Sequence, residues 1–374
     1  MSTPPGEAAA TALGLPSATS TSDLPGEAPA SVLSGEAPAS DLPGEAPALD
    51  LPSAAPAPDL PSAVPTPDLS GEAAATGWGL PFGRPGRFWR GNLHTHSNLS
   101  DGALSPADTA QVYRNAGYDF LAITDHFRPE HDYPVTDTRD LRSDTFTTLI
   151  GAELHAPATE AGQQWHIIAA GLPLDFAPPT EGETGPELAR RARAAGAFIG
   201  MAHPSASLLT AVDATSLDAA HAVEVYNALA DRENRGDSWH LTDVLLNRGH
   251  RPTTYAADDA HLQPQDPPPC QAWVHVRAES LDPTDLLSAL KAGHYYSSTG
   301  PELYDVRVED ELVVVRCSPA TKILLSGGHP GAEVLEGIGL TEGALPLALF
   351  RGTHCRITVQ DATGGRAWTN PIHR

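Results

Sequence analysis

The middle of the chain alternates short apolar runs with stretches that carry helix signals. The apolar runs cover residues 120–124, 147–152, 165–170, 197–202 and 252–257. Runs of this length that are apolar throughout are typical of strands buried on both faces of a sheet. The pattern therefore predicts a series of buried strands, and polar residues follow or accompany each of them.

Helix signals fill the stretches between these runs. Ser105 and Asp282 each precede a proline, and Thr184 precedes Gly-Pro-Glu, so all three are typical N-caps. The predicted helices cover residues 106–117, 185–196, 239–248 and 283–293. Strands that alternate with helices indicate a parallel sheet, and about seven such units in roughly 220 residues favour a βα barrel over an open sheet.

Residues that can bind metals lie next to the predicted strands. His94 and His96 are two positions apart, so in an extended strand their side chains lie on the same face. The other candidates are Asp101, His126, Glu153, His166, His203, Asp259 and His261. Because catalytic groups of βα barrels gather at one rim, we expect these side chains to converge there. Histidine with carboxylate and without cysteine suits zinc, manganese or iron.

The order of these motifs resembles that of the PHP (polymerase and histidinol phosphatase) metallohydrolases. The resemblance is carried by residues 94–102 (HTHSNLSDG), 123–126 (ITDH), 151–153 (GAE), 166 (H), 202–204 (AHP) and 259–261 (DAH), within residues 90–301. Residues 91–94, 117–121, 224–227, 296–301 and 367–372 are more narrowly similar to the carbaryl-hydrolase-like (CehA/McbA-type) branch of that family.

The resemblance implies a distorted (βα)7 TIM-like barrel, the PHP fold, that holds two or three divalent metal ions. By similarity, the first metal would be bound by His94, His96, Glu153 and Asp259, the second by Glu153, His166 and His203, and the third by Asp101, His126 and His261. Glu153 and Asp259 are also the expected catalytic residues. Glu153 would fix the separation of two metals as their shared ligand, and Asp259 would orient the attacking hydroxide.

Three further residues near these motifs affect the expected site. Ser97 stands where the family commonly has threonine, and Asp258 stands where serine is common. We expect the extra carboxylate of Asp258 to make the mouth of the site more negative. His155 is either a partner of a metal ligand or a partly exposed polar residue, with equal weight.

The expected activity is metal-dependent hydrolysis, because paired cations acidify a bridging water and stabilise the charge that develops on the attacked group. A phosphoesterase that uses a metal-bridging hydroxide is the first hypothesis. A carbamate or carboxylic ester hydrolase of the carbaryl-hydrolase type is an alternative, and a non-catalytic metal- or carbohydrate-binding module is another. Arg128, Asn227 and Arg232 are expected to contact a small anionic or ester substrate, although the two arginines could equally be solvated.

The first 83 residues differ in composition from the rest. They contain ten acidic residues, no Lys, Arg or His, and near repeats such as LPGEAPA. Such a segment cannot bury enough apolar area to offset its ordering entropy, so residues 1–83 are predicted to be a disordered tail. Residues 84–301 then form the metallohydrolase barrel.

Past residue 301 the pattern changes to short strands separated by turns. The predicted strands cover 304–309, 312–316, 322–325, 345–350 and 355–360, which indicates a small C-terminal β-sandwich over residues 302–374. Its expected role is structural support.

Charge and cysteine content limit the partners. The formal net charge is −24, which argues against binding of duplex nucleic acid, and no apolar run is long enough to span a membrane. Cys270, Cys317 and Cys355 are odd in number and unpaired by spacing, which fits a reducing, cytoplasmic location. Protein partners stay open at this point.

Overall fold

The structure is a computed structural model that describes residues 78–328, 331–350 and 354–373. Most of the predicted tail, residues 1–77, lies outside the described residues. The last part of it, residues 78–83, packs against the C-terminal strands: Leu80 is buried, and the Phe82 ring lies 5.9 Å from that of Tyr296. The tail boundary that we predicted at residue 83 therefore includes residues that belong to a hydrophobic core.

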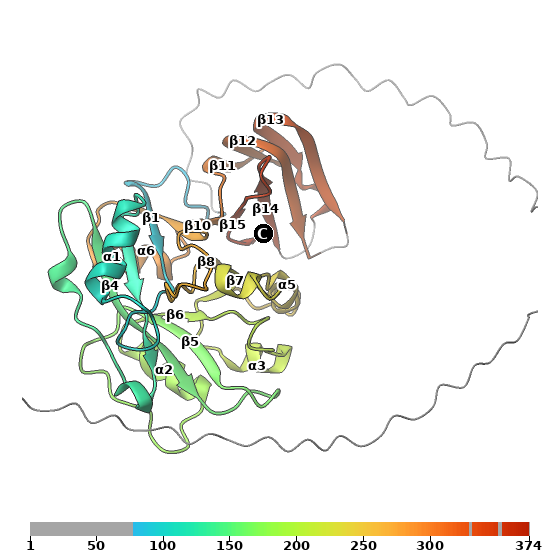
Figure 1. Ribbon diagram of the computed structural model, residues 1–374. Coiled ribbons are helices and arrows are strands. Elements are labelled where there is room, and N and C mark those ends of the chain that lie inside the picture. The colour runs from blue at the N-terminus through green and yellow to red at the C-terminus, as the bar shows by residue number, and fades with distance from the viewer. Residues whose placement is uncertain (1–77, 329–330, 351–353, 374) are drawn as a thin grey trace, which may run out of the picture. The chain divides into compact units, whose positions relative to one another are not determined.

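Seven strands follow one another as hydrogen-bonded neighbours in the first part of the sheet (Figure 1). They are β1 (Arg87–Asn92), β2 (Phe120–Ile123), β4 (Thr147–Ala156), β5 (Trp165–Ala170), β6 (Phe198–Met201), β7 (Ala222–Asn227) and β8 (Thr253–Ala257). All pair in parallel except β5, which is antiparallel to both β4 and β6. The prediction of a parallel sheet is thus wrong at β5. Residues 157–164, which connect β4 to β5, are too few to form a crossover, so the chain turns back and β5 pairs antiparallel with β4.

Backbone hydrogen bonds join the two ends of this seven-strand run. Thr95, just after β1, forms a parallel bridge with Ala260, just after β8. His96 donates its N–H to the Ala260 carbonyl at 2.9 Å, and Asp259 donates to the His94 carbonyl at 3.0 Å. These bonds lie in the two segments that carry the HxH and DxH motifs, so joining the strands also brings the motifs together.

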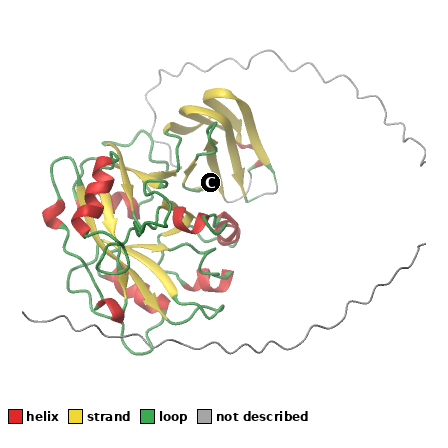
Figure 2. Cartoon of the chain, viewed as in Figure 1, coloured by secondary structure: helices red, strands yellow, loops and turns green. Residues whose placement is uncertain are grey.

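The helices lie on the outer side of these strands (Figure 2). They are α1 (Pro106–Asn115), α2 (Gly185–Ala194), α3 (Ala211–Ser216), α4 (Ala228–Asp231), α5 (Trp239–Asn247) and α6 (Pro283–Lys291), with 3₁₀ turns η1 (Pro129–His131) and η2 (Arg139–Leu141) after the short β3 (His126–Phe127). The predicted N-caps are confirmed, since Ser105, Thr184 and Asp282 each accept a hydrogen bond from the first turn of their helix. The four predicted helices are therefore present, with C-terminal ends one or two residues earlier than expected.

The C-terminal strands continue the same hydrogen-bonded sheet. They are β9 (Trp273–Ala278), β10 (Tyr295–Ser298), β11 (Leu303–Glu309), β12 (Leu312–Gly327), β13 (Ala332–Pro346), β14 (His354–Gln360), β15 (Arg366–Thr369) and β16 (Ile372–His373). β9 pairs with β1, β10 pairs with β9, and β15 pairs with β10. The predicted sandwich region is therefore connected to the first strands through continuous strand pairing.

The structure differs from the predicted C-terminal strands in two places. Residues 312–316 and 322–325, predicted as separate strands, belong to one bent strand, β12, whose register shifts between Arg316 and Lys322. The predicted strand 345–350 is wrong, because β13 ends at Pro346 and η3 (Leu347–Leu349) follows. Proline has no N–H to donate, so it suits a strand end.

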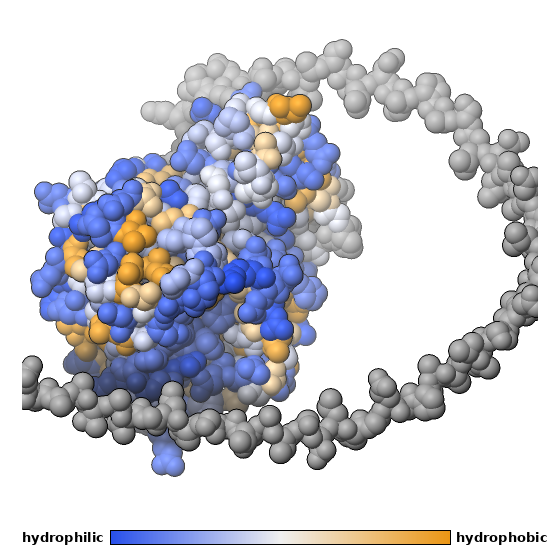
Figure 3. Space-filling model, in the orientation of Figure 1, coloured by the Kyte–Doolittle hydropathy of each residue, from blue (hydrophilic) through white to orange (hydrophobic). Residues whose placement is uncertain are grey.

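The surface in Figure 3 is mostly hydrophilic, with hydrophobic residues in small separate groups. Large exposed apolar residues include Leu99, Leu208, Val212 and Ile338. Within the described residues, none of the helices combines the length and the apolar character that a membrane span requires.

Asn370 joins the C-terminal segment to the first strands. Its side-chain oxygen accepts from the Thr254 N–H at 2.7 Å, and its amide nitrogen donates to the carbonyls of Gly293 and Tyr295 at 2.9 and 3.0 Å. Asn370→Ala would leave these buried groups unpaired, so we expect the free energy of unfolding to fall by about 3 kcal/mol. Urea denaturation measures this, with the exposed Asn115→Ala as control. Equal stabilities of the two variants would contradict the prediction.

Candidate metal centre

The nine predicted metal ligands lie in or just after six strands and in the loop before α1, and their side chains are close together. His94 and His96 follow β1, Asp101 lies in the loop before α1, His126 begins β3, Glu153 lies in β4, His166 lies in β5, His203 follows β6, and Asp259 and His261 follow β8. Because β5 runs antiparallel, its first residues lie at this edge, so His166 pairs in register with His155 of β4. The structure therefore brings together all nine side chains, including the one on the reversed strand.

One oxygen of the buried Glu153 carboxylate faces three imidazoles. Oε1 lies 2.7 Å from His166 Nδ1, 3.3 Å from His203 Nε2 and 3.7 Å from His94 Nε2. These residues come from three strands that are separate in sequence. The group contains the three residues predicted for the second metal, together with His94, which was predicted for the first.

The other oxygen of Glu153 faces a different set of imidazoles. Oε2 lies 2.6 Å from His126 Nδ1, 3.6 Å from His155 Nε2 and 3.7 Å from His96 Nε2. The two oxygens thus point to different groups, as expected of a carboxylate shared by two cations. His155 lies 2.8 Å from His126 Nδ1, which places it inside the cluster rather than at an exposed strand end.

Asp259 and Asp101 complete two more groups. Asp259 Oδ1 lies 3.1 Å from both His94 Nε2 and His96 Nε2. Asp101 Oδ2 lies 3.3 Å from His126 Nε2 and 3.4 Å from His261 Nε2.

Four sets of side chains have donor atoms close enough to share a metal ion. They are His94/His96/Asp259, His94/Glu153/His203, His126/Glu153/His155 and His96/Asp101/His126/His261. His96 therefore contributes to two sets and Glu153 links two others. The individual ligand assignments stay predictions.

The unpaired atoms in the cluster fit a metal site. Within the described residues, His94 Nε2, His96 Nδ1 and Glu153 Oε2 are buried and form no hydrogen bond of acceptable geometry. Buried polar atoms without a partner are rare in folded proteins. All three residues belong to sets of side chains that could share a metal ion, so these atoms are available to ions bound there.

The charges in the cluster favour bound cations. Burial works against ionisation of Glu153 and Asp259, but the surrounding histidines hold the pKa of both carboxyls well below the usual range. Burial works against protonation of His126, yet Glu153 and Asp101 raise its pKa to about 10. The carboxylates thus require positive charge beside them, and divalent cations meet that requirement.

Glu224 is a buried residue of this site to which the sequence analysis assigned no role. Its Oε1 accepts from His94 Nδ1 at 3.1 Å, which leaves Nε2 of that ring for a metal. Its Oε2 accepts from the backbone N–H of His203 at 2.6 Å. An acid inside the apolar run of β7 was the available signal, because buried charges are found where they have partners.

Asn227 holds these carboxylates in place. Its amide nitrogen donates to Glu224 Oε2 at 3.0 Å and to Asp259 Oδ2 at 3.2 Å, while its oxygen accepts from Ala230 N–H at 2.8 Å. The side chain is fully buried. Its amide N–H groups already have partners, so the geometry assigns Asn227 to positioning the carboxylates of Glu224 and Asp259. No atom of the side chain is exposed for the predicted contact with substrate.

Asp258 does not face the site, contrary to expectation. It is buried and accepts from Tyr113 Oη and from the backbone N–H groups of Cys270, Gln271 and Ala272 at 2.7 to 2.8 Å. Burial raises its pKa. Its carboxylate therefore anchors the loop after β8 instead of making the mouth more negative.

Asp125 supports the loop that carries Asp101. Its carboxylate accepts from Ser97 N–H at 2.7 Å and from the hydroxyls of Ser97 and Ser100 at 2.8 Å. Ser97 thus provides both its backbone N–H and its hydroxyl to this contact.

Two candidate ligands have backbone conformations that are uncommon outside glycine. Asp259 has φ of 55° and His203, which precedes a proline, has φ of 25°. Such conformations persist only where surrounding contacts hold them, and they are frequent at functional sites.

A cavity of about 450 Å³ adjoins the cluster, and its walls include His203, Leu229, Arg232, Glu233, Asp259 and Asp266. Arg232 is half exposed, and its Nη1 donates to the Gln265 carbonyl at 2.6 Å. Arg128 lies elsewhere in the site, where its Nη2 is 3.3 Å from His155 Nδ1. The structure therefore places Arg232 in a position to meet a ligand in this cavity and places Arg128 beside the cluster.

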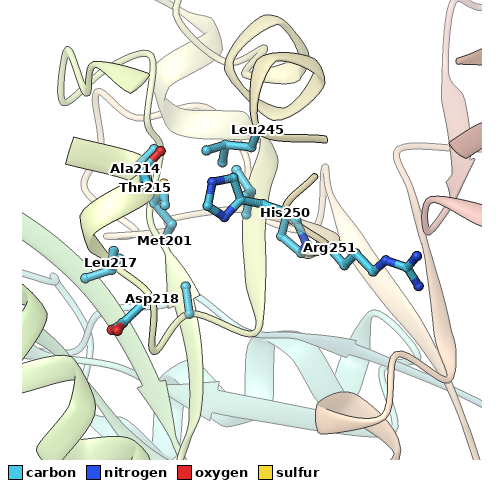
Figure 4. Close-up of a pocket in the computed structure, with 11 residues that line it drawn as sticks. Met201, Ala214, Thr215, Leu217, Asp218, Leu245, His250 and Arg251 are labelled. Carbon is cyan, nitrogen blue, oxygen red and sulfur yellow. The ribbon is translucent and has the colours of Figure 1, made fainter. Parts of the chain in front are cut away.

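Another cavity, of about 170 Å³, lies between α3 and α5 (Figure 4). Met201, Leu217, Leu245, His250 and Arg251 are among the residues that line it, and the guanidinium end of Arg251 extends away from the others. None of the nine predicted ligands lines this cavity.

Comparisons with known proteins give a distant structural likeness. No family model and no curated protein matches the sequence. A two-domain protein from Bacteroides vulgatus that contains a predicted PHP-like metal-dependent phosphoesterase is 15% identical, with 77% of this chain and 97% of that chain covered and a TM-score of 0.43. An amidohydrolase from Chromobacterium violaceum with bound sulfate is 15% identical, with 47% and 89% covered and a TM-score of 0.33. Both scores are below 0.5, so the likeness does not by itself assign the fold or the activity.

Glu224→Gln tests the role of the buried acid beside His94. The change keeps the shape but removes the negative charge, so we expect affinity for manganese or zinc to fall about 10- to 100-fold. Titration calorimetry and elemental analysis measure the effect, with the exposed Glu181→Gln as matched control. If Glu224→Gln binds metal as tightly as the control, Glu224 has no role in holding the ligands.

Proposed function

We propose that this protein is a metal-dependent hydrolase whose first candidate substrates are phosphoesters. The convergence of nine side chains with nitrogen or oxygen ligand atoms, with the buried Glu153 between two groups of imidazoles, supports the proposal most directly. Such a cluster of unpaired buried donors has a cost in stability that a purely structural role does not explain.

The side chains have distinct parts in the proposed reaction. Two or three divalent ions, with zinc, manganese or iron as candidates, would acidify water and stabilise negative charge when bound. His94, His96 and Asp259 would hold one ion, and Glu153 would share its oxygens between neighbouring sites. Asp259 also lines the cavity, with Asn227 fixing its Oδ2, so its carboxylate can orient a water or accept its proton.

The proposal also includes assignments of the fold, the family and the substrate class. The joined seven-strand run would be the distorted PHP barrel, the C-terminal strands would be its accessory sandwich, and the family would be the PHP metallohydrolases, in the carbaryl-hydrolase-like branch. Arg232, whose Nη1 lies 3.8 Å from Asp266, supplies a permanent positive charge to the cavity that His203 and Asp259 also line, so it is the candidate contact for a small anionic or ester substrate. A substrate panel of phosphomonoesters, nucleotides and aryl carbamates separates phosphoester from carbamate hydrolysis.

Glu153→Ala tests the proposed activity. We expect turnover of any substrate found in the panel to fall at least 1000-fold, because the variant removes the shared ligand, while circular dichroism stays unchanged. Chelation should abolish wild-type turnover, and added manganese should restore it. Undiminished turnover in Glu153→Ala, with Glu181→Ala as control, would rule out the proposed centre.

Arg232→Gln tests the expected substrate contact. Losing one charged hydrogen-bond donor should raise KM for an anionic substrate about ten-fold and leave KM for an uncharged aryl carbamate nearly unchanged. Arg235→Gln is the matched control, since Arg235 is exposed nearby and does not line the cavity. Equal KM values for the two variants would place Arg232 outside the substrate site.

A further inference from the structure

A third cavity, of about 300 Å³, lies between α5 and the strands β12, β14 and β15. Figure 1 shows α5 beside this end of the C-terminal strands. None of the nine predicted metal ligands lines it, so it is a separate feature of the chain.

Alternate residues of neighbouring strands form the floor of this cavity. Lys322, Leu324 and Ser326 of β12 lie opposite Gln360, Thr358 and Arg356 of β14, and Thr358 and Gln360 lie opposite Trp368 and Arg366 of β15. Alternate residues of a strand point to the same face. The intervening residues, such as Ile323 and Ile357, are in the hydrophobic core, so this second face carries polar side chains toward α5.

The wall opposite this floor is formed by the start of α5. Trp239 is buried, and the Arg356 guanidinium lies over its ring at 3.9 Å from the centroid. Both terminal nitrogens of Arg356 bind the Asp243 carboxylate, with Nη2 at 3.1 Å. Nε–H of Arg356 has no hydrogen-bond partner within the described residues.

Three buried polar atoms that have no hydrogen-bond partner within the described residues belong to side chains that line this cavity. They are Trp239 Nε1, Arg356 Nε and Ser326 Oγ. Two are obligate donors, because indole and guanidinium nitrogens cannot accept. Finding all three around one cavity points to an acceptor that binds there.

We propose that this cavity binds a small oxyanion, a carboxylate or a phosphate, whose oxygens accept from Trp239 Nε1 and Arg356 Nε. Lys322 and Arg366 lie at the more exposed side of the cavity, where Lys322 pairs with Glu336 at 2.8 Å and Arg366 is 4.0 Å from Asp237. Arg366 is thus the less tightly paired of the two, and its charge is available to the ligand. Lys322, Arg356 and Arg366 thus bring three cations to one cavity, each within 4.0 Å of a carboxylate.

The test follows the indole N–H resonance of Trp239 in ¹⁵N-labelled full-length protein. Metal is removed with a chelator that is then dialysed away, so that anions cannot bind through cations at the other site. Trp239→Phe assigns the resonance by its loss. Inorganic phosphate, benzoate and uncharged glucose are titrated separately, and the indoles of Trp89 and Trp273, which already donate to Ala278 O and His275 Nε2, serve as internal controls.

We expect saturable movement of the Trp239 resonance with phosphate or benzoate, and the tighter of the two identifies the anion class. Arg366→Gln should weaken that binding about five- to ten-fold, while Arg139→Gln, which removes an exposed cation elsewhere, should not. No movement with either anion, movement with glucose alone, or equal binding by the two variants would overturn the proposal. Loss of hydrolysis in Glu153→Ala is independent of this result, so the two proposals fail separately.

Discussion

Two backbone hydrogen bonds between distant parts of the chain hold the candidate metal centre together. His96 donates to Ala260 and Asp259 donates to His94, which joins the segment after β1 to the segment after β8. A shift of one residue in this pairing would turn the side chains to opposite faces. The observed register instead places Asp259 3.1 Å from both histidines, so the positions of the ligands follow directly from the closure of the strands.

Around this closure, the fold keeps a buried carboxylate among imidazoles, and His94 and His96 each have one ring nitrogen without a hydrogen-bond partner in the described residues. Isolated buried charges are costly, and uncommon backbone conformations such as that of His203 add to the cost. Glu224 and Asn227 reduce it by holding the ligands from behind. The supporting groups therefore determine which nitrogen of each ring is free, and with it the chemistry that the centre can perform.

In the C-terminal strands, the alternation of side chains between the two faces of the sheet serves two purposes. Alternate residues of β12 and β14 build a hydrophobic core on one face, while the residues between them carry polar groups toward α5. Asn370 then ties this region to Thr254, Gly293 and Tyr295 through three buried hydrogen bonds. The region is thus both a support for the first strands and a surface with chemistry of its own.

The sequence by itself determined the buried strands, the helix caps at Ser105, Thr184 and Asp282, and the residue types of the metal cluster, because these depend on local spacing and composition. Only the tertiary structure decided that β5 runs antiparallel, that Asp258 points away from the site, and that Glu224 lies behind His94. Each of these depends on strand direction, register and contacts between residues far apart in the chain, and no local pattern encodes which partner a buried side chain will meet.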